Sequence, residues 1–349
     1  MTEATLRVCL VHRDLPPLAG GGVPHQVLRL ARALSERGHL VTIKTLSPPS
    51  AEEAFSVERL PFGVMWRSEL FILIIFPWIV ATRRYRSYDI VHVHGNSEWL
   101  FRRRTPVIRT FYGTAKQETR HATRFRRRLS QRFVSMCEWV ALSAADYTVA
   151  ISGGAAKALG RVDRVIPCGV DLSTFHPGPK STVPAILFVG TLGGRKRGQV
   201  LVDAFVRDVL PRLPSCELWL VSPEAATGPN VRWLGKVSDP ALASLYRRAW
   251  IFCLPSTYEG FGVPYIEAMA SGTVVVATPN EGALEVLTHE SGGVISSEDQ
   301  LGLVLARLLS DSKDRRDRQD LGLLFVRRFE WSSIVTQYEE AYAAATSRR

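Results

Sequence analysis

The feature that most constrains the fold is an apolar run followed by a glycine-rich turn and a helix-forming segment, at residues 250–272. Residues 250–254 (WIFCL) have the length and apolarity of a buried strand. Gly260 and Gly262 then allow a tight loop, and Pro264 suits the first turn of a helix, where its missing N–H costs nothing. A strand that passes through glycines into a helix points free backbone N–H groups, and the positive end of the helix dipole, toward an anion.

Two carboxylates flank this predicted anion site, Glu259 before the loop and Glu267 on the helix. Neither binds phosphate, but both accept hydrogen bonds from hydroxyl groups. A phosphate cradle between two such carboxylates suits a sugar nucleotide, which carries a diphosphate between a sugar and a ribose. A surface loop with two solvated glutamates is the alternative.

The segment EGFGVPYIEAMASG, which begins at Glu259, resembles the signature of the family 4 retaining glycosyltransferases, which have the GT-B fold. The resemblance extends over nearly the whole chain. It implies that Glu259 lies by the donor sugar and that Glu267 binds the ribose hydroxyls. It also implies that the donor phosphate is held by the backbone amides of Gly260, Phe261, Gly262 and Val263.

The C-terminal half opens with a predicted strand at residues 185–189 that leads into a turn with two adjacent cations, Arg195 and Lys196. The resemblance implies that Lys196 neutralises the diphosphate and stabilises the leaving group, where charge develops in the transition state. Many family members carry an Arg directly after the first glycine of this turn. Here the pair is Gly190 and Thr191, which the resemblance places at the donor, and we expect Arg195 to supply the bidentate phosphate contact. Two solvated surface cations are the alternative.

The N-terminal half opens with a predicted buried strand at residues 6–11, a glycine-rich turn and a helix over residues 25–37. The turn lacks the GxGxxG pattern of dinucleotide-binding proteins. The resemblance implies that Gly21 and Gly22 let the backbone approach the donor phosphates or the acceptor. A plain tight turn is the alternative.

Two further predicted strands end in polar side chains. Residues 88–94 end in His94, and residues 106–111 are followed by Tyr112. Many family members carry His-Gly after the second of these strands, with the His near the donor sugar, whereas this chain has Tyr112 and Gly113. We therefore assign the polar contact with the donor sugar to either Tyr112 or His94, with a structural role as the alternative for the histidine.

Strands and helices alternate along the 349 residues, which predicts an α/β protein with parallel sheets covered on both faces. Together with the resemblance, this gives two Rossmann-like doubly wound domains facing across a cleft (GT-B). We expect an acceptor-binding domain over residues 1–172 and a nucleotide-sugar-binding domain over residues 173–328. Residues 329–349 are expected to form a C-terminal helix that packs back on the first domain.

The net charge of +11 is concentrated in one half of the chain: residues 1–180 hold 26 Lys and Arg against 14 Asp and Glu. The region from Arg102 to Arg132 has eleven basic residues and one acidic residue. From Arg120 to Arg128 the arginines have helical spacing, which indicates a basic amphipathic helix suited to an anionic membrane surface. A solvated basic face is one alternative. Nucleic acid is another, but no nucleic-acid module is recognisable, so none is expected as a partner.

The most hydrophobic window, residues 69–80, is shorter than the roughly 20 residues of a membrane span and contains Pro77. It predicts a buried or groove-lining helix, with a segment that dips into a membrane interface as the alternative. The chain starts directly with a strand, and its five cysteines show no metal-binding spacing. We therefore expect a cytoplasmic protein, at most peripheral on the cytoplasmic face of the membrane, with no metal site.

The resemblance thus implies a retaining, metal-independent, hexosyltransferase-type glycosyltransferase. Its donor would be a UDP- or GDP-linked sugar, with no further cofactor, and its acceptor a glycan or a lipid-linked molecule. The expected setting is cell-envelope glycan, glycolipid or polysaccharide biosynthesis. A catalytically silent sugar-nucleotide-binding scaffold and a sugar-nucleotide epimerase on the same architecture are the alternatives, and the base, sugar, acceptor and linkage stay open.

Overall fold

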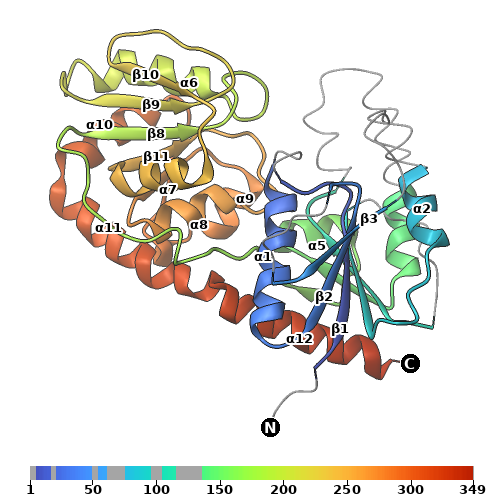
Figure 1. Cartoon of the computed structure of the whole chain (residues 1–349). Helices are drawn as coiled ribbons and strands as arrows, with labels where there is room; N and C mark the ends of the chain where they lie inside the picture. Colours follow the sequence, from blue (N-terminus) through green and yellow to red (C-terminus); the bar gives the residue numbers. More distant parts are fainter. Residues whose placement is uncertain are drawn as a thin grey trace. The chain divides into compact units, whose positions relative to one another are not determined.

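The computed structural model describes residues 5–16, 21–48, 54–60, 75–95, 104–114 and 136–348. The chain divides into two compact units (Figure 1). Unit 1 comprises Met1–Gly169 and Trp331–Arg349, and unit 2 comprises Val170–Glu330. Each unit is a parallel α/β structure with its own sheet.

Unit 1 is built on a parallel sheet that has seven strands within the described residues. In chain order they are β1 (Arg7–Val11), β2 (Leu40–Thr45), β3 (Ser56–Arg59), β4 (Ile90–His94), β5 (Val107–Phe111), β6 (Tyr147–Ala150) and β7 (Arg164–Val165). Across the sheet the order is β3-β2-β1-β4-β5-β6-β7, so the order along the chain reverses between β1 and β4.

Helices cover both faces of this sheet because alternate residues of its central strand are buried on opposite sides. Val8 and Leu10 pack in the same core as α1 (Gly22–Glu36) and α12 (Trp331–Ser347), which lie against one another in Figure 1. On the opposite face, Cys9 and Val11 pack with α2 (Phe76–Thr82). A further helix, α5 (Gly153–Leu159), follows β6 and is capped by Ser152.

Two helices differ from the sequence-based expectation, for one physical reason. The helix expected from residue 25 begins at Gly22, and α2 begins at Phe76 with Pro77 in its first turn. Proline suits a first helical turn, so Pro24 and Pro77 mark helix starts here rather than breaks. The rest of the apolar window, up to residue 74, lies outside the described residues.

Buried polar groups join α12 to the sheet of unit 1. His39 Nε2 lies 3.0 Å from Glu339 Oε1, and both side chains are buried. On β4, His92 Nδ1 lies 2.9 Å from Tyr342 Oη, and burial lowers the pKa of His92 to about 3. These four buried side chains therefore each have a hydrogen-bond partner, as burial favours.

Unit 2 is built on a second parallel sheet, of six strands. In chain order they are β8 (Ala185–Val189), β9 (Glu217–Val221), β10 (Val231–Gly235), β11 (Ile251–Leu254), β12 (Val274–Ala277) and β13 (Val294–Ile295). Across the sheet the order is β10-β9-β8-β11-β12-β13, which reverses between β8 and β11. The helices of unit 2 are α6 (Gly198–Ala204), α7 (Asp239–Arg248), α8 (Val263–Ala270), α9 (Glu281–Val286), α10 (Leu301–Ser310) and α11 (Ser312–Phe325).

The strand order locates the ligand-binding edge of each unit. In open parallel sheets, ligands bind outside the carboxyl ends of the strands, at the point where the strand order reverses. In unit 2 this switch point lies between β8 and β11, and in unit 1 it lies between β1 and β4. The loops that follow these four strands are therefore the places to look for a site.

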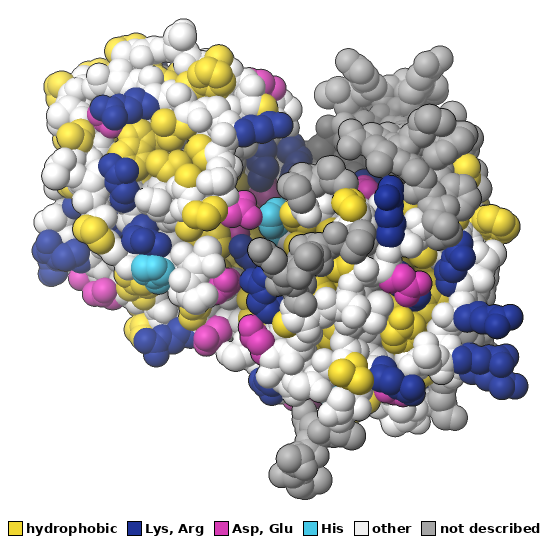
Figure 2. Space-filling view, in the orientation of Figure 1, with side chains coloured by type: hydrophobic (Ala, Val, Ile, Leu, Met, Phe, Trp, Pro, Cys, Tyr) yellow, Lys and Arg dark blue, Asp and Glu magenta, His cyan; other side chains and the backbone are white. Residues whose placement is uncertain are grey.

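Most of the basic region from Arg102 to Arg132 lies outside the described residues. One basic residue of this region, Arg109, is buried on β5, within the strand predicted at residues 106–111. On the face of unit 1 in Figure 2, Lys and Arg side chains are scattered among apolar ones. Within the described parts of the chain, no helix has the length and apolarity that crossing a membrane requires.

Candidate active site

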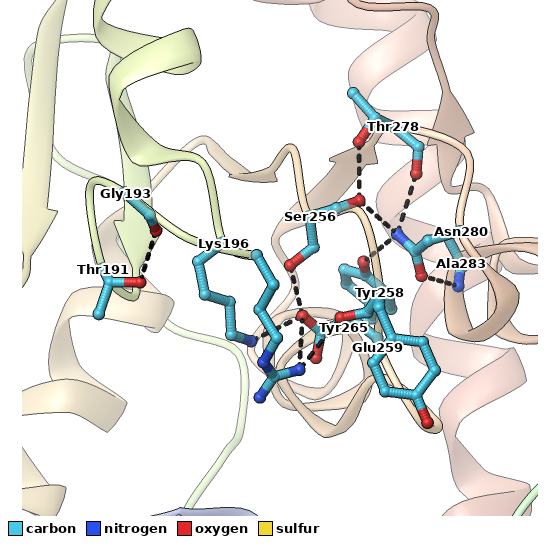
Figure 3. Close-up of polar contacts among 11 residues, drawn as sticks. Thr191, Gly193, Lys196, Ser256, Tyr258, Glu259, Tyr265, Thr278, Asn280 and Ala283 are labelled. Carbon is cyan, nitrogen blue, oxygen red and sulfur yellow. Dashed lines mark hydrogen bonds and ion pairs between the residues drawn. The ribbon is translucent and has the colours of Figure 1, made fainter. Parts of the chain in front are cut away.

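The two loops at the switch point of unit 2 meet through a carboxylate (Figure 3). Lys196, on the loop after β8, donates from Nζ to Glu259 Oε1 at 2.8 Å. Ser256, two residues after β11, donates from Oγ to the same oxygen at 2.5 Å. The Glu259 side chain is only 7% exposed, and its Oε2 has no hydrogen-bond partner among the described residues. That oxygen is available to accept a hydrogen bond from a ligand hydroxyl.

Arg195 adds a second cation at the same place. Its Nη1 donates to the carbonyl oxygen of Tyr258 at 3.1 Å and lies 3.8 Å from Glu259 Oε1. The loop backbones are also joined, because Thr257 N donates to Arg195 O at 2.9 Å. The Arg195 side chain is 51% exposed, so its guanidinium can turn toward a phosphate without leaving a buried position.

The N-cap of the helix that follows, α8, is a position that only glycine can occupy without strain. Gly262 has φ +99°, and a Cβ there would stand 2.3 Å from the ring of Tyr265. Within the described residues, no side chain caps the N-terminus of α8. Its dipole and first amides therefore remain able to stabilise an anion. Glu267 lies one turn further along this helix and is partly exposed. The pKa of the neighbouring Tyr246 is raised, mainly by burial and further by the charge of Glu267.

Four residues that sequence reasoning missed hold the Glu259 loop in place. Thr278 Oγ1 and Asn280 Nδ2 both donate to the carbonyl oxygen of Ser256, at 3.0 and 3.1 Å. Gly282 N donates to Glu259 O at 3.0 Å, and a Cβ at this glycine would come within 2.8 Å of that oxygen. Ser256 could have been found from the sequence, because it lies three positions before Glu259. The other three residues follow β12 and come near the Glu259 loop only in the folded protein.

The remaining predicted residues of unit 2 lie on the loop after β8. Thr191 donates its hydroxyl to Gly193 O at 2.9 Å, so this side chain supports its own loop. At Gly190, a Cβ would meet the Lys196 side chain at 3.0 Å. The amides of Leu192 and Gly193 donate to the Glu224 carboxylate, at 2.6 and 3.2 Å. The loop that carries Lys196 is therefore held by contacts within itself and by Glu224, which follows β9.

The predicted residues of unit 1 lie at the start of α1, at the end of β4 and directly after β5. Gly21 is the N-cap of α1 with φ +109°, and Gly22 is the first helical residue. His94, at the end of β4, and Tyr112, after β5, were expected as alternatives, but the structure joins them: His94 Nδ1 lies 3.0 Å from Tyr112 Oη. Burial, with smaller contributions from His92 and His12, holds the pKa of His94 well below its ordinary value, so the ring is neutral.

No group of three or more His, Cys, Asp or Glu residues in the described chain is arranged to hold a metal ion. In unit 2, contacts join Glu259 with Lys196 and Arg195, and Glu267 follows on the adjoining helix. Cations, an uncapped helix and carboxylates that accept from hydroxyls can together bind a diphosphate flanked by sugar rings.

Comparison with known proteins shows the family to which the chain belongs. Residues 20–174 match the family described as Glycosyltransferase Family 4, and residues 183–311 match the family described as Glycosyl transferases group 1. A D-inositol 3-phosphate glycosyltransferase of Xylanimonas cellulosilytica is 31% identical, over 94% of this chain and 93% of that protein. The chain belongs to the family 4 glycosyltransferases.

Two further similarities agree with this family assignment. A phosphatidyl-myo-inositol mannosyltransferase of Mycobacterium tuberculosis is 28% identical, over 96% of this chain and 95% of that protein. The structure of a sucrose-phosphate synthase from Thermosynechococcus elongatus matches with a TM-score of 0.83 at 22% identity, covering 99% of this chain and 100% of that chain. The GT-B fold and a hexosyltransferase-type glycosyltransferase are thereby confirmed, with no support for the scaffold or the epimerase. The roles of individual residues stay predictions.

Proposed function

We propose that this glycosyltransferase moves a hexose from a nucleotide diphosphate sugar to an acceptor hydroxyl, with retention at the anomeric carbon and without a metal ion. The observation that carries the proposal is the convergence of Lys196 Nζ and Ser256 Oγ on one oxygen of a buried Glu259 carboxylate. Their arrangement leaves the other oxygen available for a sugar hydroxyl. Arg195 and the N-terminus of α8 supply the positive charge that a metal ion would otherwise bring to the diphosphate.

The transfer step makes and breaks one bond at the anomeric carbon. The bond from this carbon to the phosphate oxygen breaks, and the acceptor oxygen bonds to it on the same face. The acceptor proton passes to the departing phosphate, so no second carboxylate is needed as a nucleophile. Lys196 stabilises the charge that develops on the leaving phosphate, an interaction that is stronger in the transition state than in the ground state.

We propose an inositol-bearing acceptor, because two relatives that align over more than nine tenths of this chain are named for inositol compounds. One name specifies phosphatidyl-myo-inositol and the other D-inositol 3-phosphate. Both names specify an inositol ring, but one ring carries a phosphatidyl group and the other a phosphate. The choice between a lipid and a free phosphate is therefore the part that experiment must settle.

A donor and acceptor panel tests the proposal. The purified chain is incubated with GDP-mannose, UDP-glucose or UDP-N-acetylglucosamine, each with phosphatidylinositol in detergent micelles or with D-inositol 3-phosphate. We expect one pair to give a glycosylated product by mass spectrometry, with the anomeric configuration of the donor by proton NMR and an unchanged rate in EDTA. Conversion of the donor to an epimer would favour the epimerase, and nucleotide binding without turnover would favour the scaffold.

We further propose that the enzyme works at a membrane surface, as a lipid acceptor would require. Two tryptophans of unit 1 are exposed, Trp78 on α2 to 58% and Trp139 to 69%. Tryptophan is enriched at membrane interfaces because its ring is apolar and its N–H is polar. Sedimentation with vesicles containing anionic phospholipid at low salt tests this: we expect binding that weakens with salt, and no binding would contradict the proposal.

A further inference from the structure

The switch point of unit 1 carries a histidine for which the proposed reaction has not yet accounted. β1 ends at Val11, and His12 is the first residue beyond it. The neighbouring strand β4 ends at His94, and Gly95 follows. His12 and Gly95 therefore lie at the carboxyl edge of the sheet, where the strand order reverses and ligands of parallel sheets bind.

One hydrogen bond fixes the tautomer of His12. Its Nδ1 lies 2.9 Å from the carbonyl oxygen of His94. A carbonyl oxygen can only accept a hydrogen bond, so Nδ1 carries the proton. In the neutral ring, Nε2 then holds a lone pair and can act only as an acceptor.

No described residue partners this acceptor nitrogen. His12 is partly exposed, and its Nε2 has no hydrogen-bond partner among the described residues and is not one of their buried unpartnered atoms. Gly95 lies beside this ring: its φ of +81° disfavours any other residue, and a Cβ there would stand 3.8 Å from Cε1 and 3.9 Å from Nδ1 of His12. Glycine at position 95 therefore leaves the space beside Cε1, the ring atom that adjoins Nε2, free of a side chain from the residue that follows β4.

The charges around His12 favour an uncharged ligand group. Burial lowers the pKa of His12, as does the neighbouring Arg13, whereas the hydrogen bond to His94 O and the charge of Asp14 oppose the shift. Arg13 and Asp14 pair with one another, at 2.5 Å, and His94 is neutral. A neutral imidazole lone pair repels a phosphate oxygen and attracts a hydroxyl proton, so the group that fits here is an O–H donor.

We propose that His12 binds the acceptor, with Nε2 accepting a hydrogen bond from a hydroxyl of a polyol ring and thereby orienting that ring for transfer. The inference rests on the proposed function, which supplies a hydroxylated acceptor. It assigns acceptor binding to the edge of β1, whereas the donor is assigned to the loops after β8 and β11. Loss of His12 should therefore affect transfer to the acceptor but leave donor binding intact.

Two rates measured with the donor of the panel test this inference. One is transfer to phosphatidylinositol or D-inositol 3-phosphate, and the other is hydrolysis of the donor by water without acceptor. In His12→Phe we expect kcat/KM for the acceptor to fall about tenfold, as expected when a ligand hydroxyl loses its partner, with hydrolysis within about twofold of wild type. His12→Gln, whose Oε1 can take the place of Nε2, should restore most of the transfer.

The pH profile adds a readout that a structural role would not change. Protonation of Nε2 abolishes its lone pair, so wild-type transfer should fall as the pH drops through the pKa of His12, while His12→Gln should lack this acidic decline. His176 serves as the matched control, because its Nδ1 also lies 3.0 Å from a backbone carbonyl oxygen, that of Pro177, but it follows no strand. His176→Phe should leave both rates unchanged.

The outcomes separate the inference from the proposed function. Wild-type rates of transfer in His12→Phe, or equal losses of transfer and hydrolysis, would overturn the role of His12 alone. A wild-type enzyme that transfers to neither inositol acceptor would overturn the proposed acceptor class, and the inference with it.

Discussion

Replacing Ser256 by alanine tests the geometry of the donor site most directly. Ser256 Oγ donates to Glu259 Oε1 at 2.5 Å from a fully buried position, and alanine removes only this hydroxyl. A hydrogen bond to a charged group contributes about 1.5–3 kcal/mol. At about 1.4 kcal/mol per factor of ten, its loss corresponds to a fall of roughly 10- to 150-fold if all of it is expressed in the transition state. Because Lys196 still holds the same oxygen, we expect a value near the lower end.

The assay is steady-state transfer with the donor varied, combined with thermal unfolding. We expect Ser256→Ala to lower kcat/KM for the donor about tenfold, since the carboxylate is less firmly oriented, with a folded protein. Thr278→Val is the matched control. Its hydroxyl donates to Ser256 O rather than to the carboxylate, and Asn280 also donates to that oxygen, so the loss should stay below about threefold.

Two results would count against this reasoning. If Ser256→Ala keeps kcat/KM within twofold of wild type, the hydroxyl does not orient a catalytically important carboxylate. If Thr278→Val lowers activity as much as Ser256→Ala does, the effect belongs to the packing of the loop and not to the hydrogen bond.

Three further changes probe other parts of the two units. Lys196→Met should lower kcat/KM by about 10²- to 10³-fold, as loss of one charge-stabilising donor does. It should also lower the melting temperature, because the Glu259 carboxylate stays buried without its cation. Adding Glu259→Gln should restore the melting temperature but not turnover. Gly262→Ala should destabilise unit 2 by about 1–3 kcal/mol in urea unfolding, because it forces a positive φ and a clash with Tyr265, whereas Gly193→Ala, which meets no atom within 4 Å, should not. If His94 acts through the hydroxyl of Tyr112, the effect of His94→Leu on kcat/KM should vanish in a Tyr112→Phe background, whereas additive effects would show that the two residues act separately.

The sequence predicted the sheets well because buried parallel strands are nearly continuous apolar runs. The strand predicted at residues 185–189 is β8, and the one predicted at residues 250–254 is β11 with one residue fewer. Helix starts were predicted less well, since the run of glycines before Pro24 indicated a loop that extends to residue 24, whereas α1 begins at Gly22. Arg109 shows a different limit: counting charges placed it in a basic region, while its place on β5 buries it.

The candidate site was predictable where it is local in sequence. Glu259, the glycine loop and Glu267 share one strand–loop–helix segment, so their order alone indicated a site. The contacts of Asn280 and Gly282 with this segment depend on where the chain returns after β12, which no local pattern encodes. Likewise, His94 and Tyr112 looked like alternatives because they follow different strands, and only the pairing of β4 with β5 brings them within hydrogen-bonding distance.

The ion pair between Lys196 and Glu259 raises the question of how one lysine can serve both its carboxylate and a donor phosphate. An ammonium group carries three N–H donors, and the structure uses one of them, toward Glu259 Oε1. The other two can reach a phosphate while the first bond persists, so donor binding need not break the pair. The persisting bond would keep Glu259 oriented while charge develops on the leaving group. Arg195, being half exposed, can move to the phosphate without disturbing this arrangement. The lysine is therefore better placed as the fixed charge of the site and the arginine as the adjustable one.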